Sequence, residues 1–401
     1  MINASLRMDN VHSDIRGPLY FKALEMQKQG TKVLKLNTGN PGTFGFTMPE
    51  SVKTALTNGM DRAVAYCNSR GMEDAREAIC AYHQSKGIKN IGVNDIYIGN
   101  GVSEIVQMLT QTLINPGDEV LCPSPNYSLW SNCVYLAGGK PVFYKCDEQA
   151  NWNPDVCDIR KKLSPRTRAL LIINPNNPTG VLYDTCVLKE MLEIARQNKL
   201  IVFSDEIYDR LVFEPKSHVS TAALAEDVNV ITLNGLSKSH IVCGFRCGWC
   251  VFSGPEGEMN HIKDAMDRLC SMRLCANALT QLVIPAALED DASTRAMLVP
   301  GGRLYEQRKA VFEALEGHEG ISFVKNDAAF YLFPKFDAKK FKVSDDHEFA
   351  MGLLNEKHIL IVPGSGFDYA SPDHFRIVML PEAEILAKAT CDMVEYLESR
   401  V

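Results

Sequence analysis

The chain has 401 residues, of which 46% are hydrophobic and 23% are charged, values typical of a soluble globular protein large enough for two domains. The formal net charge of −7 and the lack of a polybasic block give no electrostatic footprint for nucleic acid. No apolar run reaches membrane-spanning length and residues 1–10 carry no signal-peptide core, so we expect a cytoplasmic protein without a membrane partner.

Short apolar runs alternate with helical stretches from residue 95 to about residue 253. Helical periodicity is clear at 103–113 and 188–197. This alternation predicts an α/β fold with a mainly parallel sheet and helices on both of its faces. The seven expected strands are residues 96–98, 119–122, 141–144, 169–173, 200–203, 228–233 and 248–252.

The composition changes after the Pro-Gly-Gly sequence at 300–302. A charged helix is expected at 303–316, and a terminal helix is expected at 382–398. Short apolar runs between these helices predict strands near 321–324 and 329–333. This part of the chain therefore predicts a smaller α+β domain.

The 13 cysteines are scattered through apolar segments, which predicts small buried side chains in a reducing compartment. Cys243, Cys247 and Cys250 form the one cluster to weigh as a metal site. Cys247 and Cys250 have ligand spacing, but no second pair matches it, and a strand would turn them to opposite faces. We predict no metal site and leave the role of these cysteines open.

Polar side chains follow three of the expected strands. One strand is followed by Asp205 and Tyr208, another by Asn177 in a rigid turn, and a third by Lys238. The carboxyl ends of parallel strands meet at one edge of a sheet, where ligands bind. A lysine there loses hydration, which lowers its pKa and makes it a nucleophile toward carbonyl groups. A lysine extending from a strand end into water is the ordinary alternative, and the two neighbouring strand ends argue against it.

These motifs resemble, in order and spacing, those of the fold-type-I pyridoxal-phosphate aminotransferases. The matching features are Asn-Pro-Thr-Gly at 177–180, Asp205 with Tyr208, and Lys238 with Arg246. The resemblance covers nearly the whole chain. It implies a dependence on pyridoxal 5'-phosphate and amino acids and 2-oxo acids as substrates.

The resemblance also implies how the chain is divided. It predicts a large cofactor-binding domain at residues 46–299. The small domain of this family is built from both ends of the chain, which predicts that residues 1–45 join residues 300–401.

The resemblance gives the strand-end residues roles toward the cofactor. Lys238 forms the Schiff base, and Asp205 keeps the pyridine nitrogen protonated. Tyr208 and Asn177 contact the phenolic oxygen. Asp205 as a helix N-cap and Asn177 as a turn residue are the structural alternatives.

The cofactor phosphate needs a positive site rich in N–H groups. Arg246 offers a bidentate guanidinium, and Ser237 offers a hydroxyl group. Many relatives have a second serine where this chain has Gly235. The loop at 99–103 lies between an expected strand and an expected helix, so its N–H groups can face an anion. The loop residues assigned to the phosphate are Gly101, Val102 and Ser103.

Aromatic side chains complete the cofactor site that the resemblance implies. Tyr127 matches the residue that stacks on the ring, and Trp130 is the competing candidate. Tyr66 resembles a tyrosine that reaches the phosphate from a neighbouring subunit, which implies a homodimer with shared active sites. A core aromatic is the alternative for Tyr66.

The resemblance assigns substrate binding to residues from both ends of the chain. Arg376 matches the arginine that binds the substrate α-carboxylate, and an arginine between apolar strand residues is costly unless it is paired. Gly39 offers a backbone contact from a loop that closes over the substrate, and Asn177 contributes beside it. Arg16 is a candidate substrate contact, with a surface salt bridge as its alternative.

Residues 14–18, 271–277 and 300–303 resemble segments of alanine aminotransferases of the glutamate–pyruvate type. This implies transfer from L-alanine to 2-oxoglutarate, giving pyruvate and L-glutamate by a ping-pong mechanism. The alternatives are another donor (aspartate, branched-chain or aromatic) and a C–S β-lyase of the same fold. A ligand-sensing domain of a transcriptional regulator is a third alternative, but it would be joined to a DNA-binding module, and the sequence shows no helix-turn-helix pattern. A nucleotide-binding protein is a fourth, but the loop that contains Gly99 and Gly101 lacks the third glycine of that motif.

Overall fold

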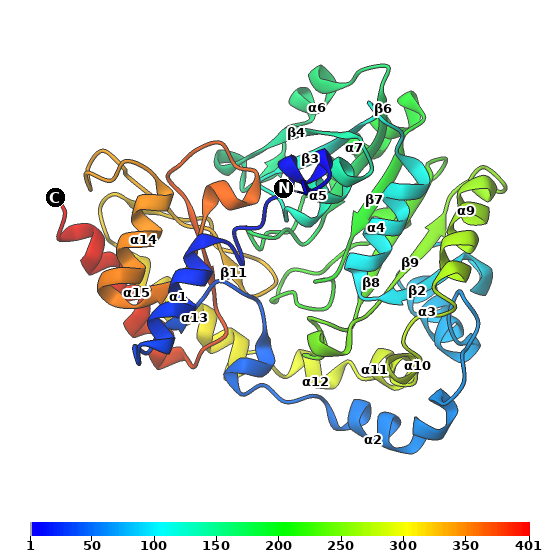
Figure 1. Cartoon of the computed structure of the whole chain (residues 1–401), viewed down its shortest axis with the longest axis horizontal. Coiled ribbons are helices and arrows are strands. Elements are labelled where there is room, and N and C mark those ends of the chain that lie inside the picture. Colours follow the sequence, from blue (N-terminus) through cyan, green and yellow to red (C-terminus); the bar gives the residue numbers. More distant parts are fainter. Residues whose placement is uncertain (1) are drawn as a thin grey trace.

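The computed structural model describes residues 2–401 as a large domain and a small domain lying side by side (Figure 1). An eight-stranded sheet with the order β2-β9-β8-β7-β6-β3-β4-β5 forms the centre of the large domain. The neighbours from β8 to β4 pair in parallel, whereas β9 and β5 are antiparallel to their neighbours. The strands are β2 (Ile96–Asn100), β3 (Glu119–Ser124), β4 (Lys140–Asp147), β5 (Asn153–Pro154), β6 (Thr167–Ile173), β7 (Ile201–Asp205), β8 (Val230–Gly235) and β9 (Cys247–Ser253).

All seven predicted strands are present, and the mainly parallel sheet is confirmed. The predicted number of strands was one too low. The additional strand, β5, has two residues and extends the sheet beyond β4 through an antiparallel pairing. A two-residue strand carries no hydrophobic alternation, so the sequence contains no signal for it.

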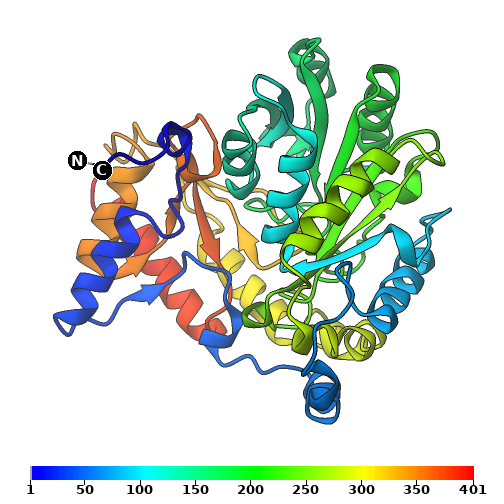
Figure 2. The same cartoon turned by 45° about the vertical axis from the view of Figure 1, so that its right-hand side comes forward.

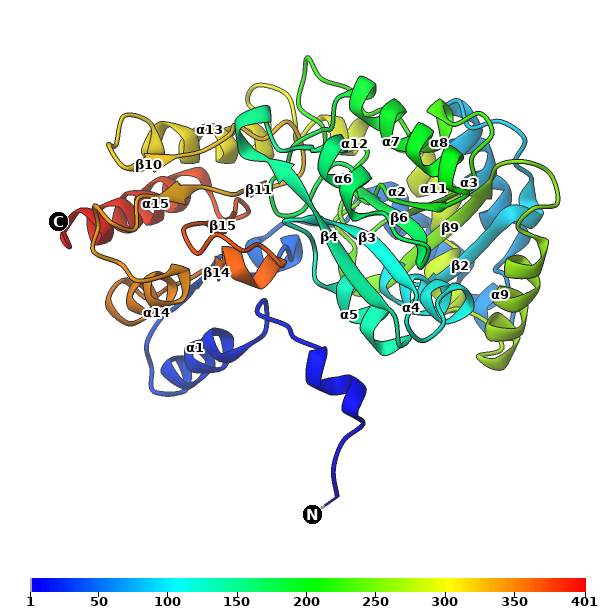
Figure 3. The ribbon, with the colours of Figure 1, turned by 90° about the horizontal axis from the view of Figure 1, so that it is seen from above.

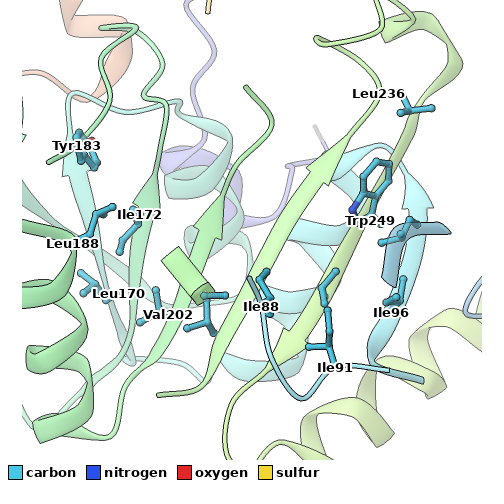
Figure 4. Close-up of a cluster of buried hydrophobic side chains, with 14 of the residues drawn as sticks. Ile88, Ile91, Ile96, Leu170, Ile172, Tyr183, Leu188, Val202, Leu236 and Trp249 are labelled. Carbon is cyan, nitrogen blue, oxygen red and sulfur yellow. The ribbon is translucent and has the colours of Figure 1, made fainter. Parts of the chain in front are cut away.

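Helices cover both faces of the sheet, as predicted (Figure 2). Successive residues of β6 divide between two cores because side chains in a strand alternate faces. Leu171 packs with residues of α4, α5 and α9, whereas Leu170 and Ile172 pack with residues of α3, α7 and α11 (Figure 4). The helices of this domain are α2 (Glu50–Gly59), α3 (Glu73–Ser85), α4 (Val102–Leu113), α5 (Leu129–Leu136), α6 (Val156–Lys162), α7 (Thr185–Asn198), α8 (Thr221–Leu224), α9 (Asn260–Met272), α10 (Ala278–Gln281), α11 (Ile284–Glu289) and α12 (Ala292–Arg295).

The small domain takes its core from both ends of the chain. Leu19 and Ala23 share one buried cluster with Phe349 and Val394, and the blue and the orange-to-red segments lie together in Figure 1. Its helices are α1 (Pro18–Lys28), α13 (Arg303–Leu315), α14 (Asp346–Lys357) and α15 (Ala383–Glu398). Its strands are β1 (Leu34–Lys35), β10 (Ile321–Ser322), β11 (Tyr331–Leu332), β12 (Lys335–Phe336), β13 (Ile359–Leu360), β14 (Val362–Pro363) and β15 (Phe375–Val378).

The predicted small-domain helices are present, whereas its strands are shorter than expected. The strand expected at 329–333 is reduced to β11. Ala329 has a φ of 59°, which lies in the left-handed region and interrupts an extended strand. Among residues 2–401, no helix has the length and apolar content that a membrane crossing requires.

The cysteines of β9 lie on opposite faces of the sheet. Cys247 belongs to the core beneath α3 and α7, and Cys250 belongs to the core beneath α4 and α9. Within the described part of the chain, no three His, Cys, Asp or Glu side chains are arranged to hold a metal ion. Cys247 and Cys250 therefore act as buried packing residues.

Candidate active site

A cavity of about 170 Å³ lies where the strand ends of the large domain meet the small domain. Ile173 and Asp205, the last residues of β6 and β7, line it, and so does Lys238, three residues beyond β8. Tyr331 and Arg376 line it from β11 and β15 of the small domain. The predicted site residues that line the cavity are Gly39, Val102, Ser103, Tyr127, Asn177, Asp205, Tyr208, Ser237, Lys238, Arg246 and Arg376.

Lys238 is half-buried, and its amino group faces the small-domain side of the cavity. Nζ of Lys238 donates a hydrogen bond of 2.8 Å to the carbonyl oxygen of Gly39. A Cβ atom at Gly39 would collide with the hydroxyl of Tyr331, so only glycine lets this loop approach so closely. The loop of Gly39 therefore lies between the lysine and Tyr331, and its close approach to Tyr331 depends on the missing side chain.

The carboxylate of Asp205 is buried at the end of β7. Its Oδ2 accepts a hydrogen bond of 3.0 Å from Nε1 of Trp130, and its Oδ1 accepts one of 3.3 Å from the backbone of Ile207. Burial raises the pKa of Asp205, although both hydrogen bonds act in the opposite direction. No helix begins after Asp205, because residues 207–210 form a turn. The helix N-cap alternative is therefore wrong.

The hydrogen bond from Trp130 to Asp205 also helps to decide whether Tyr127 or Trp130 is the stacking residue. Trp130 is fully buried beneath the site and its indole is committed to the carboxylate. Tyr127 lines the cavity, whereas Trp130 does not. The geometry therefore favours Tyr127 as the aromatic side chain that faces a ligand.

Arg376 is buried and held from several sides. Its Nη1 donates a hydrogen bond of 2.9 Å to Oδ1 of Asn177, and its Nη2 donates to the carbonyl oxygen of Asn37. The rings of Tyr331 and Phe367 lie on its guanidinium, each with a centroid distance of 4.6 Å. Burial lowers the pKa of Arg376. The guanidinium is thus fixed in place without a carboxylate partner among residues 2–401, so it can receive an anionic ligand.

Tyr208 is paired with a tyrosine that the sequence did not suggest. The two hydroxyl groups of Tyr208 and Tyr331 lie 2.8 Å apart. Burial raises the pKa of Tyr208 well above its ordinary value, so the Tyr208 phenol stays protonated and can donate a hydrogen bond into the cavity.

Arg246 and the loop before α4 form the opposite end of the cavity. Arg246 has a φ of 56°, and its Nη1 donates a hydrogen bond of 3.0 Å to the carbonyl oxygen of Cys243. Its Nη2 lies where a Cβ atom of Gly101 would be, immediately before the first turn of α4. At Gly235, a Cβ atom would come within 2.6 Å of the carbonyl oxygen of Cys247, which leaves no room for the serine found in many relatives. A guanidinium beside a helix N-terminus is suited to an anion such as a phosphate.

Replacing Gly101 with alanine is expected to destabilise the fold by about 1–3 kcal/mol. Gly101 has φ and ψ of 81° and 162°, a conformation open essentially to glycine alone, and the added Cβ would also displace Arg246. Gly117→Ala is the matched control, because Gly117 has a φ of 88° but an added Cβ atom would meet no other atom within 4 Å. Urea denaturation measures both variants. An equal loss in the two would contradict tight packing between Gly101 and Arg246.

Three predicted site residues do not line the cavity: Gly101, which directly precedes the lining residue Val102, together with Tyr66 and Arg16. Tyr66 is 79% exposed, so the alternative of a core aromatic is wrong. Arg16 is also exposed and makes no ion pair among residues 2–401, although its neighbour Ile15 lines the cavity. Their predicted roles therefore depend on a second subunit for Tyr66 and on a bound substrate for Arg16.

Several cavity residues were not predicted. Ile15 and Thr38 come from the N-terminal part of the chain, and Cys243 comes from the loop that precedes β9. The thiol of Cys243 contacts Oδ1 of Asn40 at 3.2 Å. None of these residues has a sequence signal of its own. The other cavity residues missed from the sequence are Leu129, Ile173, Ile207 and Tyr331.

Comparisons with known proteins identify relatives over the full length. The glutamate–pyruvate aminotransferase AlaA of Haemophilus influenzae is 47% identical over 391 residues, which cover 98% of this chain and 97% of that protein. The alanine aminotransferase of Mycobacterium tuberculosis is 39% identical, over 98% of this chain and 92% of that protein.

Solved structures agree with these relatives. The crystal structure of an aminotransferase from Escherichia coli has a TM-score of 0.97 at 45% identity, over 99% of this chain and 98% of that chain. The alanine aminotransferase from Pyrococcus furiosus has a TM-score of 0.94 at 38% identity, over 99% of this chain and 100% of that one. The sequence model of the family described as aminotransferase class I and II matches residues 31–389. With this match, these relatives and a lysine, an aspartate and an arginine in one cavity, the chain belongs to the class I and II aminotransferase family.

Proposed function

We propose that the protein uses pyridoxal 5'-phosphate to transfer the amino group of L-alanine to 2-oxoglutarate, giving pyruvate and L-glutamate in a ping-pong reaction. The observation that carries this proposal is the convergence of Lys238, Asp205 and Arg376 on one cavity. These three residues supply an amine, a buried carboxylate and a buried guanidinium. Together they match the aldehyde and ring nitrogen of the cofactor and the carboxylate of an amino acid.

The residues of the cavity fit pyridoxal phosphate at both of its ends. Arg246 and the N–H groups that begin at Gly101 would hold the phosphate, and the guanidinium of Arg246 occupies the space that a side chain at Gly101 would need. Asp205 at the end of β7 provides a carboxylate for the ring nitrogen. Lys238 would hold the aldehyde covalently. Tyr208 and Asn177 would donate to the phenolic oxygen.

The cofactor supplies an electron sink that makes the Cα–H bond of an amino acid acidic. Asp205 would hold a proton at the ring nitrogen, where a cationic partner compensates the cost of burying its charge. Nζ of Lys238, once the substrate amine has replaced it, would take the proton from the substrate Cα. In the second half of the reaction Nζ would return a proton to the Cα of the new amino acid.

Arg376 would bind the α-carboxylate of each substrate. Its Nε has no hydrogen-bond partner among residues 2–401, and a substrate carboxylate would satisfy it. Asn177 and Asn37 fix the guanidinium before the substrate arrives, which reduces the entropy lost on binding. The ring of Phe367 shields the guanidinium from water.

Alanine is supported as the donor by the relatives. Proteins 47%, 45% and 39% identical to this chain carry names for glutamate–pyruvate or alanine transamination, whereas an aspartate aminotransferase of a Bacillus species is 30% identical. The cationic side chains that line the cavity are Lys238, Arg246 and Arg376, and each already has a role. Arg16, beside Ile15, is the candidate contact for the second carboxylate of 2-oxoglutarate.

A panel of amino donors with 2-oxoglutarate tests the proposal. We expect alanine to give kcat/KM at least about tenfold above aspartate, branched-chain and aromatic donors, because selective binding of one side chain is worth about 1–3 kcal/mol. Alanine alone should also bleach the visible absorption band of the purified holoenzyme. Negligible turnover of alanine beside good turnover of another donor would contradict the proposed substrate. Release of ammonia and pyruvate from a cysteine conjugate without a 2-oxo acid would indicate a β-lyase instead.

An exposed apolar surface supports a homodimer with shared active sites. Val64, Tyr66 and Met272 are 86%, 79% and 80% exposed, and a hydrogen bond of 3.3 Å from Gln281 to the thiol of Cys67 joins their two segments. Exposed apolar patches of this kind mark interfaces between proteins. A second copy on this surface would bring its Tyr66 to the phosphate site.

A further inference from the structure

An N-terminal segment, residues 6–17, runs from the large domain to α1 of the small domain (Figure 3), and its Ile15 lines the active-site cavity. It begins with the short 3-10 helix η1 (Leu6–Asn10), which packs on α5 of the large domain. Nη1 of Arg7 donates a hydrogen bond of 3.2 Å to the carbonyl oxygen of Leu136, in the last turn of α5. The segment ends where α1 of the small domain begins at Pro18. It therefore depends on contacts with both domains.

His12 is the residue through which the N-terminal segment is fixed. Its backbone N–H donates to Oδ1 of Asn132 at 3.1 Å, and Nδ2 of Asn132 donates to the carbonyl oxygen of His12 at 2.6 Å. Nε2 of His12 lies 3.3 Å from Oδ1 of Asp368. The side chain of His12 is 40% exposed, whereas that of Asp368 is 8% exposed. A half-exposed imidazole thus meets a buried, pre-positioned carboxylate.

The other oxygen atoms of Asp368 already accept hydrogen bonds. Its Oδ2 accepts hydrogen bonds from Nδ2 of Asn126 at 3.0 Å and from Oγ of Ser131 at 2.7 Å. Its carbonyl oxygen accepts a hydrogen bond of 2.7 Å from Oγ of Ser124. Asp368 follows the short 3-10 helix η7 (Gly364–Phe367) of the small domain. The carboxylate is thereby fixed with Oδ1 directed at His12.

The N-terminal segment reaches the active site three residues after His12. Ile15 lines the cavity, and its carbonyl oxygen accepts a hydrogen bond of 2.7 Å from Nδ2 of Asn37. The carbonyl oxygen of Asn37 in turn accepts a hydrogen bond from Arg376. Asp14 packs so closely on Gly366 that a Cβ atom there would come within 2.5 Å of its own Cβ. A continuous set of contacts therefore connects the position of the segment with the substrate-binding arginine.

We propose that His12 is a positioning residue, whose protonated ring pairs with Asp368 and holds the N-terminal segment against the cavity, so that Ile15 and Asn37 keep Arg376 in place for the substrate carboxylate. His12 does not line the cavity and acts through the residues that follow it. The effect on substrate binding rests on the transamination proposed above, whereas the docking of the segment does not.

The charges around His12 give this contact a pH dependence. The hydrogen bond to Asp368 raises the pKa of His12 above its ordinary value of about 6.5, the charge of Asp14 adds to the increase, and burial acts against it. Tyr135 and Cys122 also face Asp368, but burial raises the pKa of both, so they stay neutral in the same range. The docking stabilised by protonated His12 is fully present below about pH 6.5 and is lost as the pH rises through the raised pKa.

The test measures the KM of the holoenzyme for 2-oxoglutarate between about pH 5.5 and about pH 8.5, where both carboxylates of this substrate stay ionised. Three proteins are compared: the wild type, His12→Gln and His12→Lys. The wild-type KM should rise about threefold across this range, because a half-exposed ion pair contributes only enough free energy for a change of a few fold. The glutamine variant should show the high KM throughout, and the permanently charged lysine variant should show the low KM throughout. The kcat of all three should agree within about twofold.

His318→Gln is the matched control, because Nδ1 of His318 lies 3.0 Å from a carboxylate oxygen of Glu398 on the far side of the small domain. It should retain the wild-type pH profile of KM. A ratio of KM between His12→Gln and the wild type that is the same at every pH would overturn the proposal, because a merely structural role predicts that result.

Hydrogen–deuterium exchange of residues 6–17 separates this proposal from the proposed function. At about pH 6, the segment should exchange about threefold faster in His12→Gln than in the wild type or in His12→Lys. That result with a wild type that fails to transaminate alanine would refute only the proposed reaction. Equal exchange in the wild type and the glutamine variant would overturn the role of His12 whatever the activity.

Discussion

Replacing Lys238 with alanine is expected to lower the kcat of transamination by about 10³-fold or more, because both covalent attachment and proton transfer at the substrate Cα are lost. No other side chain of the cavity can take over, because its other cations, Arg246 and Arg376, are guanidinium groups that stay protonated. The cofactor should still bind, since Asp205 and Arg246 are unchanged. Steady-state turnover of alanine with 2-oxoglutarate measures the loss, and the visible spectrum measures cofactor binding.

Lys340→Ala is the control for this experiment. Nζ of Lys340 donates a hydrogen bond of 2.9 Å to a backbone carbonyl oxygen, as Nζ of Lys238 does, but Lys340 lies in the small domain outside the cavity. Its removal should leave kcat unchanged. Borohydride trapping followed by peptide mapping gives a second check. A covalent label on a residue other than Lys238, or undiminished turnover in Lys238→Ala, would refute the assigned role.

Replacing Asp205 with asparagine is expected to lower kcat by about 10²- to 10³-fold, the range for loss of one preorganised electrostatic contact in a buried site. The neutral amide cannot compensate a positive charge at the ring nitrogen, so the proton there would no longer be held. The hydrogen bond from Trp130 has an acceptor in either variant, provided that the amide oxygen occupies the place of Oδ2. Steady-state kinetics with saturating cofactor measure the effect.

Glu206 offers a matched control in the neighbouring position. It is as buried as Asp205, but its Oε1 accepts hydrogen bonds from Ser204, Ser220 and the backbone of Thr221, away from the cavity. Burial raises the pKa of Glu206 to about 7, so an amide is a close substitute at neutral pH. Glu206→Gln should keep kcat within about twofold of the wild type. A similar loss in both variants would show that Asp205 acts through the fold and has no specific role at the ring nitrogen.

The site residues at the ends of the large-domain strands could be predicted from the sequence. Asp205, Asn177 and Lys238 follow apolar runs long enough to be recognised as buried strands, and neighbouring parallel strands end at a common edge. That these residues meet in one cavity could therefore be predicted without knowing how the side chains pack. Arg376 was found through the family resemblance, since a single arginine between apolar residues has many structural explanations.

The small-domain side of the site could not be found in this way. Tyr331 lies in a two-residue strand, and its hydrogen bond to Tyr208 spans 123 positions of sequence. The aromatic indole of Trp130 makes it a candidate for stacking on a ligand, whereas in the structure its N–H donates a hydrogen bond to Asp205. Short elements and alternative uses of one side chain leave no periodic pattern that could be read in advance.

By itself the sequence determined the α/β class, the order of the strands along the chain and the chemistry at the strand ends. These depend on hydrophobic periodicity and on residue types within a few positions of each other. Only the tertiary structure decided that Asn37 and Phe367 contact Arg376, that Ile15 holds Asn37, and that His12 faces Asp368. Such contacts form when the two chain ends dock against the large domain, and the free energy of that docking is shared among residues far apart in sequence.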